Sequence, residues 1–260
     1  MEIYGINSVV FSESNEAPHC IVMPWMEHGN INQFLYRLHE QEQTLNIDRW
    51  LLQIAEGLKY LHDRNVVHGD LRGANVLIDS DHNVRLTDFG LSIFMRTRTS
   101  SSAASSTSGG SCKFQAPELL DINMKIDNIA SDSATAVDFA TTADSDTSSD
   151  FETTAEFPTA VDIYSFACTC IELYSGKEPQ FQFELKLKHY HPQHKNAIAK
   201  LVLAGERPVR PASGYLIMGD ALWAALQGYW APDPNVRPTA QQLVEDFTSF
   251  VDPGQADSRS

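Results

Sequence analysis

Apolar residues recur at helical spacing in two long stretches of the chain. In residues 48–62 they fall three or four positions apart, and Asn46 or Asp48 can cap the start. Residues 161–175 carry almost no charge in their middle and end at Gly176, which suits a helix C-terminus. The first pattern predicts a helix with one apolar face, and the second predicts a helix that is buried on all sides.

Shorter apolar runs predict β-strands between and before these helices. Two of them, 76–78 and 84–86, flank a polar turn at 79–83 and predict a hairpin. Three more lie near the N-terminus, at 3–6, 8–11 and 20–23. A further helix is predicted over 196–203, ending at Gly205.

Two internal segments have compositions that are poor in core-forming residues. Residues 95–111 are mostly Ser and Thr, and residues 126–158 are rich in Ala, Ser, Thr and Asp without any Lys or Arg. Such segments have little to bury. We therefore expect a mobile loop at 95–111, a disordered insertion at 126–158 that can be deleted with little effect on folding, and a frayed tail at 251–260.

Length and charge narrow the class of protein. The chain has 260 residues, 42% of them hydrophobic, which suffices for one large domain or two small ones. Its net charge of −15 argues against nucleic acid or an anionic membrane as a partner. Four cysteines form no disulfide framework, and no apolar stretch reaches the roughly 18 residues of a membrane span. Reduced thiols and a cytoplasmic location are expected.

The polar chemistry is concentrated in three short motifs. His68-Gly69-Asp70-Leu71-Arg72-Gly73-Ala74-Asn75 lies after the first helix, Asp88-Phe89-Gly90 follows the hairpin, and Ala116-Pro117-Glu118 comes later. The order resembles the catalytic loop, the D-F-G motif and the A-P-E motif of protein kinases. The segment 110–118 is most similar to that of tyrosine-kinase-like Ser/Thr kinases. An ordinary turn between strands is the alternative for the polar residues taken alone.

This resemblance implies an α+β, protein-kinase-like fold, with a mainly helical C-lobe and a remnant of the β-rich N-lobe. It places the N-lobe strands and hinge in residues 1–26, the C-lobe in 27–250 and a tail in 251–260. It also implies ATP and Mg²⁺ as cofactors and a protein as substrate, with Ser/Thr favoured over Tyr. A regulatory protein partner is left open.

The resemblance also implies roles for particular residues. Asp70 would be the catalytic base, Arg72 would steady the γ-phosphate, and Asn75 and Asp88 would hold Mg²⁺. Three residues would contact the adenine: Met23, Met26 and Leu77. Asp162 would brace the catalytic loop, while Glu118 and Arg237 would form a structural ion pair. His189, His191 and His194 could suggest a metal site, but an exposed loop is the better interpretation.

The chain departs from the kinase pattern in two respects. Gly69 stands where the family has the Arg that captures a phosphate on the activation segment, so switching by that route is doubtful. The residues before the hinge show no Gly-rich loop, strand Lys or helical Glu, so we expect very weak or no activity from these 260 residues. Two interpretations follow: a kinase whose N-lobe lies outside this sequence, or a catalytically impaired pseudokinase that acts as a binding or scaffold module.

Overall fold

The computed structural model describes residues 5–7, 20–88, 111–121, 159–182 and 195–251. The described helices are α1 (Ile31–Glu40), α2 (Ile47–His62), α5 (Ala160–Ser175), α7 (Lys195–Leu203), α8 (Asp220–Tyr229) and α9 (Ala240–Val251). The described strands are β1 (Gly5–Asn7), β2 (Cys20–Val22), β3 (Val76–Ile78) and β4 (Val84–Leu86). Short 3₁₀ turns lie at Gly73–Asn75, Ser111–Lys113 and Pro234–Val236.

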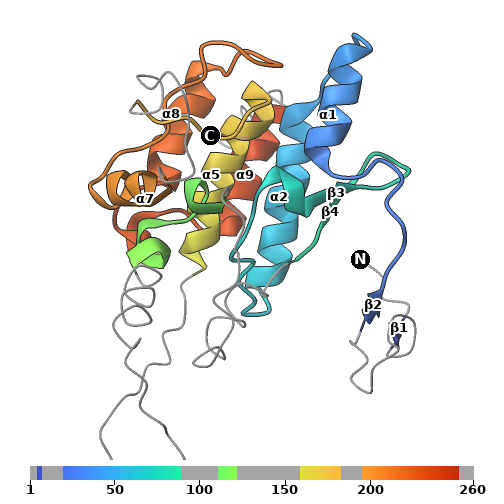
Figure 1. Cartoon of the computed structure of the whole chain (residues 1–260), viewed down its shortest axis with the longest axis horizontal. Helices are drawn as coiled ribbons and strands as arrows, with labels where there is room; N and C mark the ends of the chain where they lie inside the picture. Colours follow the sequence, from blue (N-terminus) through green and yellow to red (C-terminus); the bar gives the residue numbers. More distant parts are fainter. Residues whose placement is uncertain (1–4, 8–19, 89–110, 122–158, 183–194, 252–260) are drawn as a thin grey trace, which may run out of the picture.

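Helix α5 is the centre of the helical body. In Figure 1 it lies between α8 on one side and α2 on the other, and it contacts both. Every residue from Val161 to Tyr174 is buried, which confirms the prediction of a helix without an exposed face. Gly176 ends it with a φ of 69°, the left-handed conformation that glycine adopts at little cost.

The other predicted helices are confirmed, and each begins one residue earlier than the sequence pattern indicates. Helix α2 starts at Ile47 with Asn46 as its cap and packs along α9, while α7 starts at Lys195. Among the helices in the described ranges, α1, α8 and α9 were not predicted. Helix α1 has a capping box, in which Asn30 accepts from the Gln33 amide and the Gln33 side chain accepts from the Asn30 amide.

The predicted hairpin is present. Strands β3 and β4 pair antiparallel, with Val76 opposite Leu86 and Ile78 opposite Val84. The Asp79 carboxylate holds the turn by accepting from the amides of Asp81 and Asn83 at 3.0 and 2.9 Å. Strands β1 and β2 also pair antiparallel, with Gly5 opposite Val22.

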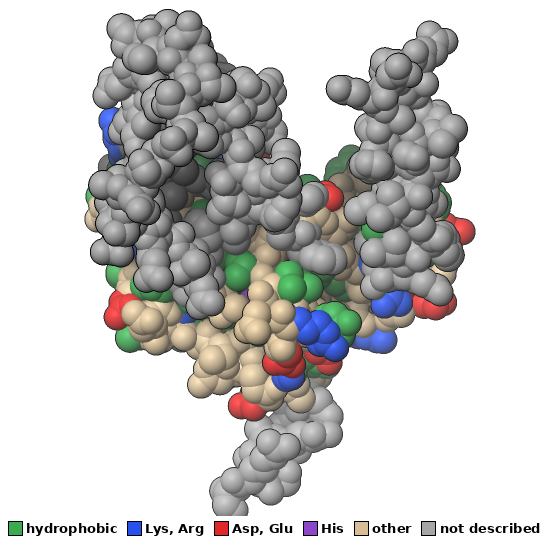
Figure 2. Space-filling view, turned by 90° about the horizontal axis from the view of Figure 1, so that it is seen from below, with side chains coloured by type: hydrophobic (Ala, Val, Ile, Leu, Met, Phe, Trp, Pro, Cys, Tyr) green, Lys and Arg blue, Asp and Glu red, His purple; other side chains and the backbone are tan. Residues whose placement is uncertain are grey.

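Several predictions fall on parts of the chain outside the described residues. They concern the strand at 8–11, most of the loop at 95–111, the insertion at 126–158, the histidines at 189, 191 and 194, and the tail from 252. Within the described residues, none of the helices combines the length and the apolar character needed to cross a membrane. Figure 2 shows acidic and basic side chains interspersed over the visible described surface.

Candidate active site

The central polar residues lie in the loop that joins α2 to β3. The Asn75 side-chain amide donates from Nδ2 to the Asp70 carbonyl at 2.7 Å and to Asp70 Oδ2 at 2.9 Å. Arg72 Nε lies 3.6 Å from the same Oδ2 atom. The side chains of Asp70 and Arg72 remain 20% and 23% exposed, so both can reach a ligand in solvent. The structure therefore brings three of the predicted catalytic residues together.

Asp88 lies beside this group because the end of β4 is fixed to Asn75. The Thr87 amide donates to the Asn75 carbonyl at 3.0 Å, and Asp88 follows with an exposed side chain and a φ of 56°. Phe89 and Gly90 are outside the described residues.

The side chains of Asn75 and Asp88 carry oxygen atoms of the chemical type that a magnesium ion takes as ligands. Since Asn75 Nδ2 faces Asp70, the carbonyl Oδ1 is the atom left for a metal, and Asp88 supplies a carboxylate. In the described part of the chain, no three His, Cys, Asp or Glu side chains are grouped as a metal site. Mg²⁺ needs no such group, because it commonly takes one or two protein oxygens and completes its shell with phosphates and water.

The residues predicted to contact the adenine lie in two separate segments that the structure brings only partly together. The Ile78 amide donates to the Gly29 carbonyl at 2.9 Å, and Asn30 forms an isolated bridge with Leu77. Leu77 thus lies against residues 29–30, just after the predicted hinge, while Met23 lies next to β2 with 37% of its surface exposed. The Met26 carbonyl accepts from the Gly29 amide at 3.0 Å and forms the turn between them.

Asp162, near the start of α5, holds the beginning of the catalytic loop. Its Oδ2 accepts from the His68 amide and from His62 Nε2, and its Oδ1 accepts from the Gly69 amide, each at 2.8 Å. A buried carboxylate requires such donors, because desolvation is costly. The loop backbone that leads into Asp70 is therefore fixed by a helix in the core.

His68 is fully buried, and this burial lowers its pKa, with nearby Asp162 and Asp70 opposing the shift. Its Nδ1 atom accepts from the Asp70 amide at 3.3 Å, which requires that Nδ1 carry no proton. Burial and the hydrogen bond both favour the neutral imidazole at the base of the loop.

Glu118 and Arg237 form a two-pronged ion pair across 119 positions of the chain. Arg237 Nη1 and Nη2 lie 2.7 and 3.0 Å from the two carboxylate oxygens of Glu118. Two further N–H groups of Arg237, on Nη1 and Nε, donate to the carbonyls of Ala160 and Ala231, both at 2.9 Å. The Arg237 side chain is completely buried and that of Glu118 is 23% exposed. This pair joins the A-P-E segment to the start of α5 and to the segment before α9.

Two side chains of α5 that contact the catalytic loop or the segment before the A-P-E motif were not predicted from the sequence. Ser165 donates from Oγ to the Phe114 carbonyl at 2.7 Å, and Glu172 accepts from the Gly73 amide at 2.8 Å. Glu172 could have been noticed as a lone acidic residue late in a helix that is otherwise apolar. A charge in that position needs a buried partner.

Comparison with known proteins agrees with this geometry. Residues 2–133, about half of the chain, match the family model for protein tyrosine and serine/threonine kinases. Mitogen-activated protein kinase kinase kinase 5 of Arabidopsis thaliana is 30% identical over 90% of this chain and 26% of its own length. Receptor-interacting serine/threonine-protein kinase 1 of Homo sapiens is 26% identical over 90% of this chain and 30% of its own length. Serine/threonine-protein kinase STY17 of Arabidopsis thaliana is 25% identical, with coverages of 89% and 32%.

The chain belongs to the protein tyrosine and serine/threonine kinase family. Its fold is the α+β fold of that family, with a mainly helical C-lobe preceded by strands of the β-rich N-lobe. It spans less than a third of the length of the relatives named above.

Proposed function

We propose that this chain carries the catalytic loop of an ATP-dependent protein kinase that phosphorylates Ser or Thr hydroxyls, with Tyr as the less favoured acceptor. The observation that carries the proposal is the contact of Asn75 Nδ2 with Asp70 Oδ2, at 2.9 Å, in a loop whose backbone is fixed by Asp162. Phosphoryl transfer depends mainly on such positioning.

Each residue then has a defined part in the transfer. Asp70 accepts the proton of the substrate hydroxyl as that oxygen forms its bond to the γ-phosphorus and the bond to ADP breaks. Arg72, held beside Asp70, stabilises the charge on the γ-phosphoryl oxygens. Asn75 and Asp88 would hold Mg²⁺, which neutralises charge on the nucleotide phosphates when bound. The adenine would lie between the hinge residues Met23 and Met26 and the side chain of Leu77.

The preference for Ser or Thr rests on two supports. The relatives at 25% and 26% identity are named serine/threonine-protein kinases. The segment from Gly110 to Glu118 has the G-S-x-x-aromatic-x-A-P-E pattern of that group.

The partners proposed for the chain are a protein substrate and a regulatory protein. Cys168 and Cys170 are buried thiols that form no disulfide, in keeping with a reducing, cytoplasmic compartment.

A binding or scaffold module is the second candidate, and Gly69 is the observation that favours it. Glycine at this position supplies no guanidinium to capture a phosphorylated residue of the loop at 95–111. A scaffold would retain the Glu118–Arg237 pair for folding but would have no use for metal ligands at positions 75 and 88.

Nucleotide binding separates the two candidates. We expect a fluorescent ATP analogue to bind in the presence of Mg²⁺, and to bind at least about ten-fold more weakly when Asp88→Ala or Asn75→Ala removes a ligand oxygen. Asp81→Ala is the matched control, because it removes an exposed carboxylate from the same hairpin. Binding that ignores Mg²⁺, or that responds equally to Asp81→Ala and Asp88→Ala, would reject the kinase proposal in favour of the scaffold.

A further inference from the structure

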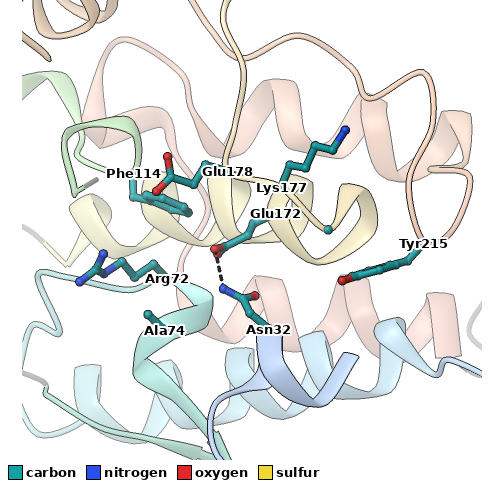
Figure 3. A pocket seen from close by; sticks show the side chains of 9 residues that line it. Asn32, Arg72, Ala74, Phe114, Glu172, Lys177, Glu178 and Tyr215 are labelled. Atoms are coloured by element: carbon teal, nitrogen blue, oxygen red, sulfur yellow. Dashed lines mark hydrogen bonds between the residues drawn. The ribbon is translucent and has the colours of Figure 1, made fainter. Parts of the chain in front are cut away.

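Glu172 lies on α5, ten positions after Asp162, and its side chain is turned toward the catalytic loop. Its Oε1 accepts from Asn32 Nδ2 and its Oε2 accepts from the Gly73 amide, both at 2.8 Å. Figure 3 shows Glu172 and Asn32 facing each other beside Arg72 and Ala74. One carboxylate therefore contacts α1 and the catalytic loop at the same time.

We propose that Asn32, Glu172 and Gly73 form a positioning clamp that fixes the second half of the catalytic loop and couples it to α1. Asp162 fixes the loop at residues 68 and 69, and Glu172 fixes it at residue 73. The two carboxylates are separated by ten residues of one helix, a rise of about 15 Å. The loop that carries Asp70 and Arg72 is thus held at both ends by one buried helix. This role as a positioning device rests on the proposed function.

The packing around Gly73 shows that the clamp is tightly fitted. A Cβ atom on Gly73 would lie 2.3 Å from Asn32 Oδ1 and 2.7 Å from Asn32 Cγ. These distances are too short for real contacts, so no side chain fits at position 73 while Asn32 keeps its place. The clamp also links the catalytic loop to the segment that precedes α1. Asn30, the N-cap of α1, forms a β-bridge with Leu77.

The electrostatic environment makes Glu172 dependent on its two donors. Burial raises its pKa, and the Gly73 and Asn32 hydrogen bonds oppose that shift. Two charged neighbours face it, with Glu178 raising the pKa and Arg72 lowering it, and Lys177 lines the same cavity of about 280 Å³. Loss of either donor would leave a desolvated carboxylate less well compensated.

Hydrogen exchange of the full chain tests the clamp without any need for activity. In Glu172→Ala we expect the amides of residues 70–75 to exchange about ten-fold faster or more, with α9 unchanged, because the loss of a charge-assisted hydrogen bond frees the loop locally. Glu172→Gln should stay near the wild type, since its carbonyl can accept from Gly73 and its amide can donate to a rotated Asn32. Glu178→Ala is the control, because it removes a half-exposed carboxylate from the same cavity.

A second pair of variants tests the close fit. Gly73→Ala alone should speed exchange in the loop, because the new methyl group collides with the Asn32 side chain. The same substitution in an Asn32→Ala background should have a much smaller effect, since the colliding atoms are gone. Equal effects in the two backgrounds would show that Asn32 does not constrain Gly73, which would overturn the clamp.

The positioning role has its own readout. Single-turnover phosphate transfer at saturating ATP should fall at least about ten-fold in Glu172→Ala and recover in Glu172→Gln, with nucleotide affinity unchanged. Unchanged loop exchange in Glu172→Ala, or exchange that rises equally in α9, would overturn the proposal. If Glu172→Ala speeds exchange in the loop as expected but the wild type binds no Mg²⁺-nucleotide, the proposed function would be rejected. The clamp would then stand as a structural brace of the loop.

Discussion

The backbone conformation at position 69 of the catalytic loop favours glycine. Its φ is 76°, in the left-handed region, and its amide donates to Asp162 at 2.8 Å. Glycine adopts this conformation without steric cost, whereas an L side chain does not. Glycine is therefore well suited to the backbone at position 69, where it stands in place of the phosphate-binding arginine of the family.

We expect Gly69→Ala to lower the free energy of unfolding by about 1–2 kcal/mol, because it puts a Cβ atom into the left-handed conformation. Gly228→Ala is the control: position 228 lies in α8 with open space around it, so alanine should raise the stability by up to about 1 kcal/mol. Urea unfolding of both variants measures the difference. The same sign of effect at both positions would show that the conformation of Gly69 is not what the structure describes.

His68 should make stability depend on pH. Its folded-state pKa lies below the ordinary value of 6.5, so the unfolded chain binds more protons in the range just below that value. The free energy of unfolding therefore keeps its full His68 contribution above pH 6.5 and loses it as the pH falls through the lowered pKa.

The non-titrating variant His68→Asn isolates this effect. Its stability relative to the wild type should stay constant between pH 7.5 and 6.5 and improve as the pH falls further to 5, because the unfolded wild-type chain then gains a proton that the buried imidazole does not take up. Urea titrations across that range check the trend. A difference between the two proteins that is constant with pH would mean that His68 does not titrate with folding.

At the scale of elements, periodicity predicted the helices whose apolar pattern is long and regular. It was sufficient for α2 and α5, and the β3–β4 hairpin followed from its polar turn. Helix α1 was not predicted, although its buried residues Ile31, Phe34, Leu35 and Leu38 have helical spacing. Motif residues such as Asp70 and Asn75 are local in sequence, so the candidate site could be predicted from them. The contact of Asn32 with Glu172 joins residues 140 positions apart and could not.

Asp162→Ala tests how far α5 determines the order of the loop. The substitution leaves the buried amides of His68 and Gly69 without their acceptor, so we expect a loss of about 3–5 kcal/mol in the free energy of unfolding. Asp220→Ala removes an exposed carboxylate that pairs with Arg210 and should cost only about 0–1 kcal/mol. Similar losses in the two variants, measured by urea unfolding, would contradict the bracing role of α5.

At the scale of the whole molecule, the Glu118–Arg237 pair connects parts of the chain that are far apart in sequence. Arg237 contacts the A-P-E segment, the carbonyl of the first residue of α5 and the carbonyl of Ala231, which follows α8. Such a buried pair is costly to break on one side only, because the remaining charge stays desolvated.

A double-mutant cycle measures this connection. Glu118→Ala and Arg237→Ala should each cost roughly 3–5 kcal/mol, and the double mutant should lose much less than the sum. Urea unfolding of the three variants gives the coupling energy. Strictly additive losses would mean that the two residues do not interact in solution, whatever each contributes alone.

The proposed role of Asp70 is that of the base for transfer of phosphate to a hydroxyl. The measurement is single-turnover transfer from radiolabelled ATP to a mixed protein substrate, followed by analysis of the phosphorylated amino acids, with Asp70→Asn beside the wild type. From these 260 residues we predict at most a very slow, Mg²⁺-dependent labelling of Ser and Thr, which falls to background in Asp70→Asn while nucleotide binding persists. Labelling at an equal rate in both proteins would contradict the role of Asp70, and robust turnover by the wild type would contradict the expectation of very weak activity.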